Sequence, residues 1–108
     1  MPLFMDVHEN LPEGASAKDV AQAHAADVKT QDQYGVKYMK YWVDEKNGKV
    51  FCLVEAPNAA TAEKVHREAH GLVADRIFEV EEGSSPGAQP RLTVGTDPRA
   101  VRMRVRRS

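Results

Sequence analysis

The 108-residue sequence predicts one α+β domain with the element order strand, helix, strand, strand, helix, strand. An Asn-Gly pair at 47–48 lies between two segments rich in aromatic and β-branched residues, which is typical of a β-hairpin. On each side of this hairpin, apolar residues recur three and four positions apart, as in amphipathic helices, and short alternating segments lie at both ends. Because crossovers between parallel strands are right-handed, this order favours a ferredoxin-like sandwich with both helices on one face of an antiparallel sheet.

The first strand is expected over residues 2–8, where two sets of side chains alternate. The uniformly apolar set is predicted to face the helices and consists of Leu3, Met5 and Val7. The second set is predicted to lie on the uncovered face of the sheet and consists of Phe4, Asp6 and His8.

The first helix is predicted over about 17–33, since Ser16 and Asp19 form a start similar to a capping box and Gly35 can end it. Its expected buried stripe consists of Ala17, Val20, Ala21, His24 and Val28.

The hairpin spans 38–56, and a two-residue turn at Asn47-Gly48 would place Asp44 opposite Phe51. Side chains that alternate along a strand then form two faces. The face expected under the helices consists of Met39, Tyr41, Val43, Cys52, Val54 and Ala56. The face expected to be open consists of Tyr38, Lys40, Trp42, Asp44, Phe51, Leu53 and Glu55.

A second helix is predicted over about 59–70, because Asn58 can cap its start and Gly71 can supply the left-handed turn after it. Its expected inner stripe consists of Ala62, Val65, Ala69 and Leu72. The last strand, 76–82, would place Phe78 and Val80 on one face. The open sheet face mixes aromatic and aliphatic groups, so we expect it to be covered by a second copy in a homodimer.

Composition and charge divide the chain into a domain over 1–83 and a basic extension over 84–108. Residues 83–108 hold six Arg and one Asp, which leaves a net charge of −6 on 1–82. After a linker rich in Gly, Ser and Pro, the alternation at 101–106 indicates an edge strand or a disordered arm. The acidic body and the absence of aromatic residues from the tail argue against nucleic-acid binding by this tail as the main function.

No segment is apolar over a membrane-spanning length, and the start of the chain lacks the basic segment of a signal peptide, so we expect a cytoplasmic protein. A lone Cys52 excludes an internal disulfide and a multi-cysteine zinc site. On the core face of the hairpin its thiol is expected to be inert. Gly-rich phosphate loops and Ser/His/Asp arrangements are not found in the sequence.

His66 and His70 are the most distinctive feature, because imidazoles four residues apart on a helix can reach one metal ion. Glu63 lies one turn earlier on the same flank and could add an oxygen ligand. Arg67 follows the first His, where a zinc-protease helix requires Glu, so that class is rejected. The alternative is that both His are solvated residues on an outward flank.

Asp6 and His8 form a second candidate metal site, with Glu55 nearby on the hairpin as a further ligand. A different interpretation is a small dimeric α/β-barrel enzyme that uses Asp6, His8, Lys40 and Glu55 for proton transfer. A third is a Lys–Glu pair buried at the dimer interface. His24 lies within the expected stripe of the first helix and reads as a core histidine, with Asp27 as its partner.

Three segments carry a resemblance to one family: MPLFMDVHENLPEG, YGVKYMKYWVDEKNGKVFCLVEAP and HREAHGLVADRIFEVEEG. Together they resemble small bacterial nickel-binding proteins, long described as a domain of unknown function, whose members are ferredoxin-like dimers. The resemblance implies nickel binding at the dimer surface and a role in sequestering excess nickel, without an established enzymatic activity. Recurring polar residues of the family that are present here are Asp6, His8, His24, Tyr41, Glu55, His66 and His70.

These observations together predict a cytoplasmic homodimer that binds or buffers nickel for metal homeostasis. Zinc or copper would bind such nitrogen and oxygen ligands comparably or more tightly, so the residue types do not select the metal.

Overall fold

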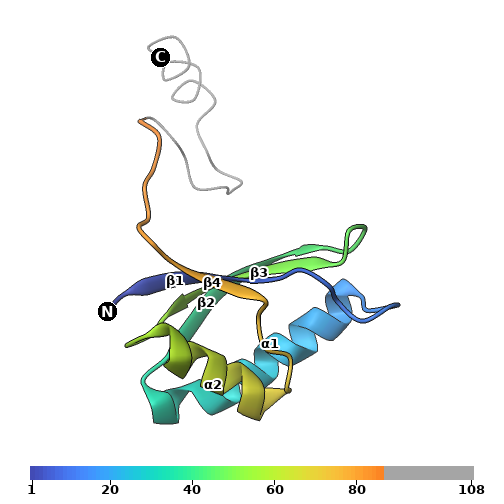
Figure 1. Cartoon of the computed structure of the whole chain (residues 1–108), viewed down its shortest axis with the longest axis horizontal. Coiled ribbons are helices and arrows are strands. Elements are labelled where there is room, and N and C mark those ends of the chain that lie inside the picture. The colour runs from blue at the N-terminus through green and yellow to red at the C-terminus, as the bar shows by residue number, and fades with distance from the viewer. Residues whose placement is uncertain (87–108) are drawn as a thin grey trace, which may run out of the picture.

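The computed structural model describes residues 1–86 and contains a four-stranded antiparallel sheet with two helices on one face (Figure 1). The strand order is β2-β3-β1-β4. In chain order the elements are β1 (Leu3–His8), α1 (Ala17–Gln31), a 3₁₀ turn η1 (Asp32–Tyr34), β2 (Lys37–Asp44), β3 (Lys49–Glu55), α2 (Ala59–Ala69) and β4 (Arg76–Val80). This arrangement confirms the predicted ferredoxin-like fold.

Both helices begin where the sequence predicts. Ser16 and Asp19 form a reciprocal capping box, and the Asn58 side chain accepts a hydrogen bond from the Thr61 amide. The first helix ends two residues early, because η1 replaces its last turn and Gly35 closes that turn at φ 63°. Only glycine adopts this left-handed conformation without strain, which explains its place at the end of the segment.

The predicted register of the hairpin is wrong by two residues. Asp44 lies opposite Lys49, so the turn has four residues, 45–48, instead of two. The Asp44 carboxylate accepts hydrogen bonds from the Asn47 amide at 3.1 Å and from its side chain at 2.8 Å, and these bonds stabilise the longer turn. Because the shift is even, Cys52, Val54 and Val43 keep their predicted place on the helix side.

An irregularity in β2 changes the face of two residues at its start. The pairing with β3 shifts between Tyr38 and Lys40, as in a β-bulge. Tyr38, which was predicted on the open face, is buried under the helices, whereas Met39 is 38% exposed. Tyr41 returns to the helix side, where it packs against the core as predicted.

The predicted orientation of β1 is also wrong. Phe4 pairs with Val54 and Asp6 with Cys52, so the set that contains Asp6 and His8 lies beneath the helices. Asp6 is only 1% exposed. Hydrophobic alternation could not decide the direction, since both faces of β1 carry apolar side chains and the buried polar groups pair with one another.

The inner faces of the helices are more polar than the predicted stripes. On α1, Val20 is buried as expected, but Asp27 and Gln31 are also buried and Val28 is exposed. The buried residues of α2 are Ala62, Val65 and His66. The predicted stripe residue Leu72 is exposed. A cluster of polar side chains therefore lies within the helix–sheet interface.

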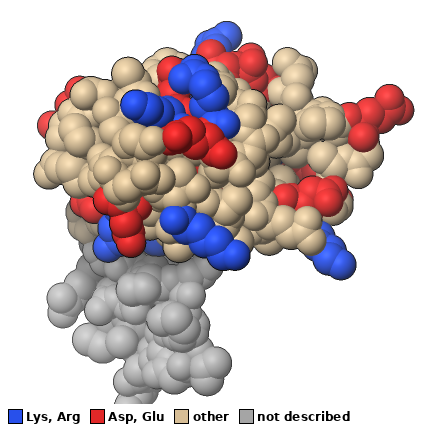
Figure 2. Space-filling view, turned by 90° about the horizontal axis from the view of Figure 1, so that it is seen from below, with Lys and Arg blue, Asp and Glu red and all other residues tan. Residues whose placement is uncertain are grey.

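The outer surfaces of the domain differ in character. Trp42 and Phe78 are each about half exposed, Phe78 facing away from the helices opposite Met5. Figure 2, which views the molecule from the side of the helices, shows small groups of Lys and Arg next to groups of Asp and Glu, with neither sign dominant.

In residues 1–86, no helix is long and apolar enough to cross a membrane. The strand or arm expected at 101–106 lies outside the described residues, and the domain boundary at 83 stays a prediction.

Candidate functional site

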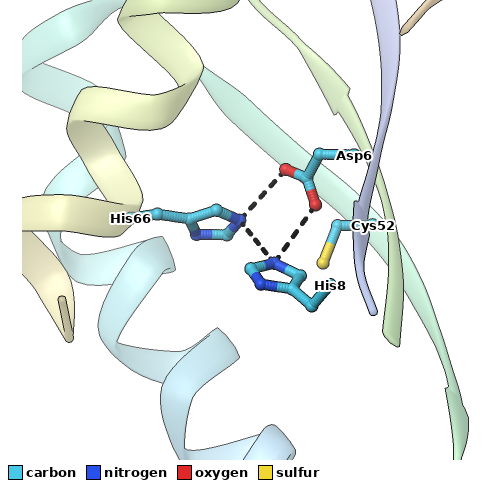
Figure 3. Close-up of side chains that lie close together, drawn as sticks. All are labelled: Asp6, His8, Cys52 and His66. Carbon is cyan, nitrogen blue, oxygen red and sulfur yellow. Dashed lines mark hydrogen bonds and ion pairs between the residues drawn. The ribbon is translucent and has the colours of Figure 1, made fainter. Parts of the chain in front are cut away.

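Five ionisable side chains from three elements meet between the helices and the sheet. They are Asp6 and His8 of β1, Asp27 of α1, His66 in α2, and His70 at its end. Figure 3 shows Asp6, His8 and His66 pointing toward one another, with the Cys52 thiol beside them. The two candidate sites that the sequence suggests separately, one on the helix and one on the sheet, therefore lie together in the structure.

His66 is the centre of the cluster. Its Nδ1 lies 2.9 Å from Asp27 Oδ1, and its Nε2 lies 3.0 Å from Asp6 Oδ2 and 3.4 Å from His8 Nε2. The ring also stacks on Tyr38 at a centroid distance of 4.5 Å. His66 is 1% exposed, so its predicted place on an outward flank of α2 is wrong.

The two carboxylates control the charge of His66. Burial alone lowers the pKa of this imidazole, but the hydrogen bonds with Asp27 and Asp6 outweigh burial and raise the pKa to about 9. Burial raises the pKa of both aspartates, and the contacts with histidines reverse this and hold each pKa below its usual range. At neutral pH His66 is therefore an imidazolium between two carboxylates.

Asp6 keeps one oxygen without a hydrogen bond. Its Oδ2 accepts from the Tyr38 hydroxyl at 3.0 Å and from His66. Its Oδ1 is buried and has no hydrogen-bond partner within residues 1–86, and its nearest charged neighbour is His8, whose Nε2 lies 3.3 Å away as an ion-pair contact. A buried carboxylate oxygen normally has a partner, so this atom has capacity for a further ligand.

The positions of the donor atoms fit a metal ion. Atoms bound to one ion at about 2.0 to 2.1 Å lie about 2.8 to 3.4 Å apart, from right-angle to tetrahedral geometry. His66 Nε2 lies 3.0 Å from Asp6 Oδ2, His8 Nε2 lies 3.3 Å from Asp6 Oδ1, and the two imidazole nitrogens are 3.4 Å apart. The two facing imidazole nitrogens, and the Asp6 oxygen nearest to each of them, are therefore already at the spacing of one coordination shell.

Asp27 contacts the other nitrogen of the His66 ring, Nδ1, which faces away from Asp6 and His8. A carboxylate on the second nitrogen fixes the tautomer of a metal-binding imidazole and makes the ring a stronger donor. The same Asp27 oxygen lies 3.1 Å from His70 Nε2, so Asp27, His66 and His70 form a second group with metal-ligand spacing. His66 belongs to both groups.

Cys52 completes the first group, since its sulfur lies within 4.8 Å of the donor atoms of Asp6, His8 and His66. Burial and the nearby Asp6 carboxylate raise the pKa of the thiol far above its usual value. Its predicted inertness fits a neutral thiol in the metal-free protein.

A pocket of about 310 Å³ opens beside the cluster. His8, His66 and His70 line it together with Asp27. Its apolar lining residues include Leu11, Val20, Ala23, Val50 and Leu72. His24 and Tyr41 also line it, with their rings 4.7 Å apart.

Glu63 and Glu55, the other two predicted ligands, lie in neither group of donor atoms. Glu55 pairs with Leu3 and Lys37 in the sheet, on the face opposite Asp6. Lys40 lies on this opposite face as well, across from Leu53. The predicted acid/base site of Asp6, His8, Lys40 and Glu55 is therefore wrong, because the sheet separates its two halves.

Asp27 and Tyr38 were not predicted as site residues. Asp27 was expected to pair with His24, but it contacts the histidines of α2 instead. The sequence did contain a signal for Asp27, because it lies one turn after His24 on the helix face that includes Val20. Tyr38 carried none, because the bulge that turns it inward is not visible in the sequence.

Comparison with known proteins identifies relatives of this fold. A family model described as nickel responsive protein SCO4226-like matches residues 4–80. The chain is also similar to the crystal structure of SCO4226 from Streptomyces coelicolor A3(2), with 35% sequence identity and a TM-score of 0.70. The match covers 76% of this chain and 99% of the SCO4226 chain. Among curated proteins there is no match. The chain therefore belongs to the SCO4226-like family of nickel-responsive proteins.

Proposed function

We propose that this protein binds nickel, or a closely related divalent transition metal, through Asp6, His8 and His66. The observation that carries the proposal is the convergence of two imidazole nitrogens and the Asp6 carboxylate at separations of 3.0 to 3.4 Å, with one oxygen of that carboxylate left without a hydrogen bond. Asp27 would hold the His66 ring in place from behind.

Charge supports this assignment. In the metal-free protein, the proton on His66 Nε2 lies between the ring and Asp6. A divalent cation bound there would replace that proton and balance the buried carboxylates more fully. Two imidazoles and a carboxylate suit nickel, zinc or copper, so the donor set supports the metal class and the family description supports nickel.

The biological role that follows is sequestration or buffering of the metal. The description of the family as nickel responsive supports a link to nickel levels. A mostly buried site with its own charge compensation would retain the ion, which is what a buffering protein requires.

Calorimetric titration with nickel tests the metal site. We expect His8→Gln to weaken nickel binding at least about tenfold, because it removes one of three donors. His8 is the least buried of the three, and its replacement leaves the Asp27, His66 and Asp6 contacts in place. His24→Gln is the matched control and should bind as the wild type does. Equal affinity of both variants and the wild type would refute this ligand set.

We also propose that the protein is a homodimer through the open face of the sheet. Trp42 and Phe78 are about half exposed in the monomer, which supports an interface there. Trp42→Glu is expected to shift the mass measured by light scattering from dimer to monomer. Val28→Glu, at an exposed position on α1, is the control that should stay dimeric. A dimer that survives Trp42→Glu would exclude this face.

A further inference from the structure

We propose that the pocket of about 310 Å³ beside the polar cluster binds a small uncharged aromatic molecule with one ring. This binding site goes beyond the proposed metal binding and does not depend on it, because the walls of the pocket are already formed in the metal-free protein. The size of the pocket, its apolar walls and the mutual pairing of its polar groups support this ligand class.

The pocket is large enough for one ring. Its volume is about 310 Å³, whereas an apolar cavity of about 150 Å³ is enough to bind benzene. Protein interiors are close-packed, and voids larger than one water molecule are few. A cavity of this size beside core residues is therefore a candidate ligand site. Its apolar and small lining residues include Leu11, Val20, Ala23, Val50, Cys52 and Leu72.

Hydrogen bonds hold the loop between β1 and α1, which forms one wall of the pocket. The Leu11 amide donates to the Gly48 carbonyl at 2.9 Å, and the Ala17 amide donates to the Glu45 carboxylate at 3.1 Å. The turn at 45–48 thus supports this loop at two points. A wall that is in place before binding loses little further freedom, which favours the binding of a small ligand.

The polar side chains at the inner end of the lining are directed at one another. Asp27 Oδ1 lies 2.9 Å from His66 Nδ1 and 3.1 Å from His70 Nε2. Figure 3 shows the facing ring nitrogens of His8 and His66, both close to Asp6. These contacts are made within the protein, so the surface left for a ligand is mainly apolar.

Charged groups in the lining do not offer a free partner to a charged ligand. Within residues 1–86, no Lys or Arg lines the pocket, so an anion would lack a permanently charged partner. For a cation, Asp27 is already paired, and Asp19 accepts hydrogen bonds from Ser16 in the capping box. Glu13, the third carboxylate, is exposed to solvent. Because burial of an unpaired charge is costly, the pocket favours an uncharged ligand.

Two aromatic side chains of the lining favour an aromatic ligand over a saturated one. His24 of α1 and Tyr41 of β2 both line the pocket, with ring centroids 4.7 Å apart. Each is half-buried, so part of each side chain is accessible from the pocket side. Aromatic rings attract one another in edge-to-face and offset arrangements beyond the gain from burial alone. A ligand ring would add such a contact.

Probes of nearly the same shape test the ligand class on the metal-free full chain in the presence of a chelator. Benzamide is uncharged, benzoate is an anion and benzamidine is a cation at neutral pH. We expect millimolar benzamide to shift the amide NMR signals of Ala23 and Val50. Both charged probes should bind at least about tenfold more weakly. Cyclohexanecarboxamide, with a saturated ring, should bind about two- to tenfold more weakly than benzamide.

Two variants locate the binding. Ala23→Phe places a ring in the pocket and should abolish benzamide binding. Ala21→Phe, at an exposed position two residues earlier on α1, is the matched control and should bind as the wild type does. Leu72→Ala is the second variant and leaves the core intact, because Leu72 is 43% exposed. It should weaken benzamide binding about threefold, since it removes apolar contact from the lining.

Three results would overturn the proposal. They are the absence of localised shifts at millimolar benzamide, a charged probe that binds as tightly as benzamide, and unchanged benzamide binding in Ala23→Phe. Equal binding of cyclohexanecarboxamide would overturn the aromatic assignment. Because these measurements use metal-free protein, none of them decides whether nickel binds. Calorimetric titration with nickel tests that function separately.

Discussion

Raising the pH should destabilise the metal-free protein, because His66 loses its charge. The pKa of His66 is raised from 6.5 to about 9 in the folded state by Asp27 and Asp6. A group with a raised folded pKa stabilises the fold fully below its unfolded pKa, and this stabilisation is lost as the pH rises through the folded value. The loss therefore begins near pH 6.5 and is complete above pH 9.

The magnitude follows from the two pKa values. Proton linkage gives His66 a contribution of about 3 kcal/mol to the free energy of unfolding at pH 6 and about 1 kcal/mol at pH 8.5. The pKa values of Asp6 and Asp27 are lowered, so both carboxylates stay ionised over this range and add nothing to the slope. We therefore expect a decrease of about 2 kcal/mol between pH 6 and 8.5.

Urea unfolding of the full chain in the presence of a chelator measures this decrease. The series should stop at pH 8.5, because the Cys52 thiol has an ordinary pKa of 9.0 and begins to ionise in the unfolded chain above that point. His66→Gln should remove the slope, and His24→Gln should keep it, since the contacts of His66 remain. A wild-type free energy of unfolding that is constant from pH 6 to 8.5 would refute the assignment of His66 as an imidazolium.

Three further predictions concern the metal and the helices. Nickel affinity should rise about tenfold per pH unit between pH 6.5 and 8.5, because the metal displaces a proton from His66. This trend is opposite to that of the free energy of unfolding. Competition with a metal-sensitive dye measures the affinity, and an affinity that does not change with pH would contradict the prediction. Glu63→Gln and Glu55→Gln should leave nickel affinity unchanged in the same assay, since neither carboxylate lies in a donor group; a loss in either would restore it as a ligand. Asn58→Ala should cost about 1 kcal/mol in thermal unfolding, because it removes the N-cap of α2; an unchanged melting temperature would exclude that contribution.

The order of elements could be predicted from the sequence because its signals are local. Ser16 and Asn58 mark helix starts, and Gly35 marks an end, through hydrogen bonds and backbone angles within a few residues. The turn at 45–48 was predicted in place but not in length, since the Asp44 side chain competes with the two-residue geometry by bonding to Asn47. Local chemistry thus fixes where elements begin and end.

The direction of a strand is not a local property. Both faces of β1 carry apolar side chains, and the choice depends on what the opposite layer offers. Asp6 is buried because Tyr38 and His66, which are 32 and 60 residues away, supply its hydrogen bonds. The prediction that Leu3, Met5 and Val7 face the helices assumed that a charged side chain lies at the surface. That assumption fails for Asp6, because its carboxylate pairs with the buried cation of His66.

One cause unites the errors in the sheet and on the helix. An ionised Asp6 in the core costs several kcal/mol unless it is paired, and so does a charged His66, so each can be buried only with the other. Asp27 joins them from α1, and the three elements can then pack in only one rotational setting. This polar cluster interrupts the apolar pattern of each element. It therefore also specifies how α1 and α2 lie on the sheet. A metal ion at Asp6 and His66 would stabilise the same arrangement of helices and sheet.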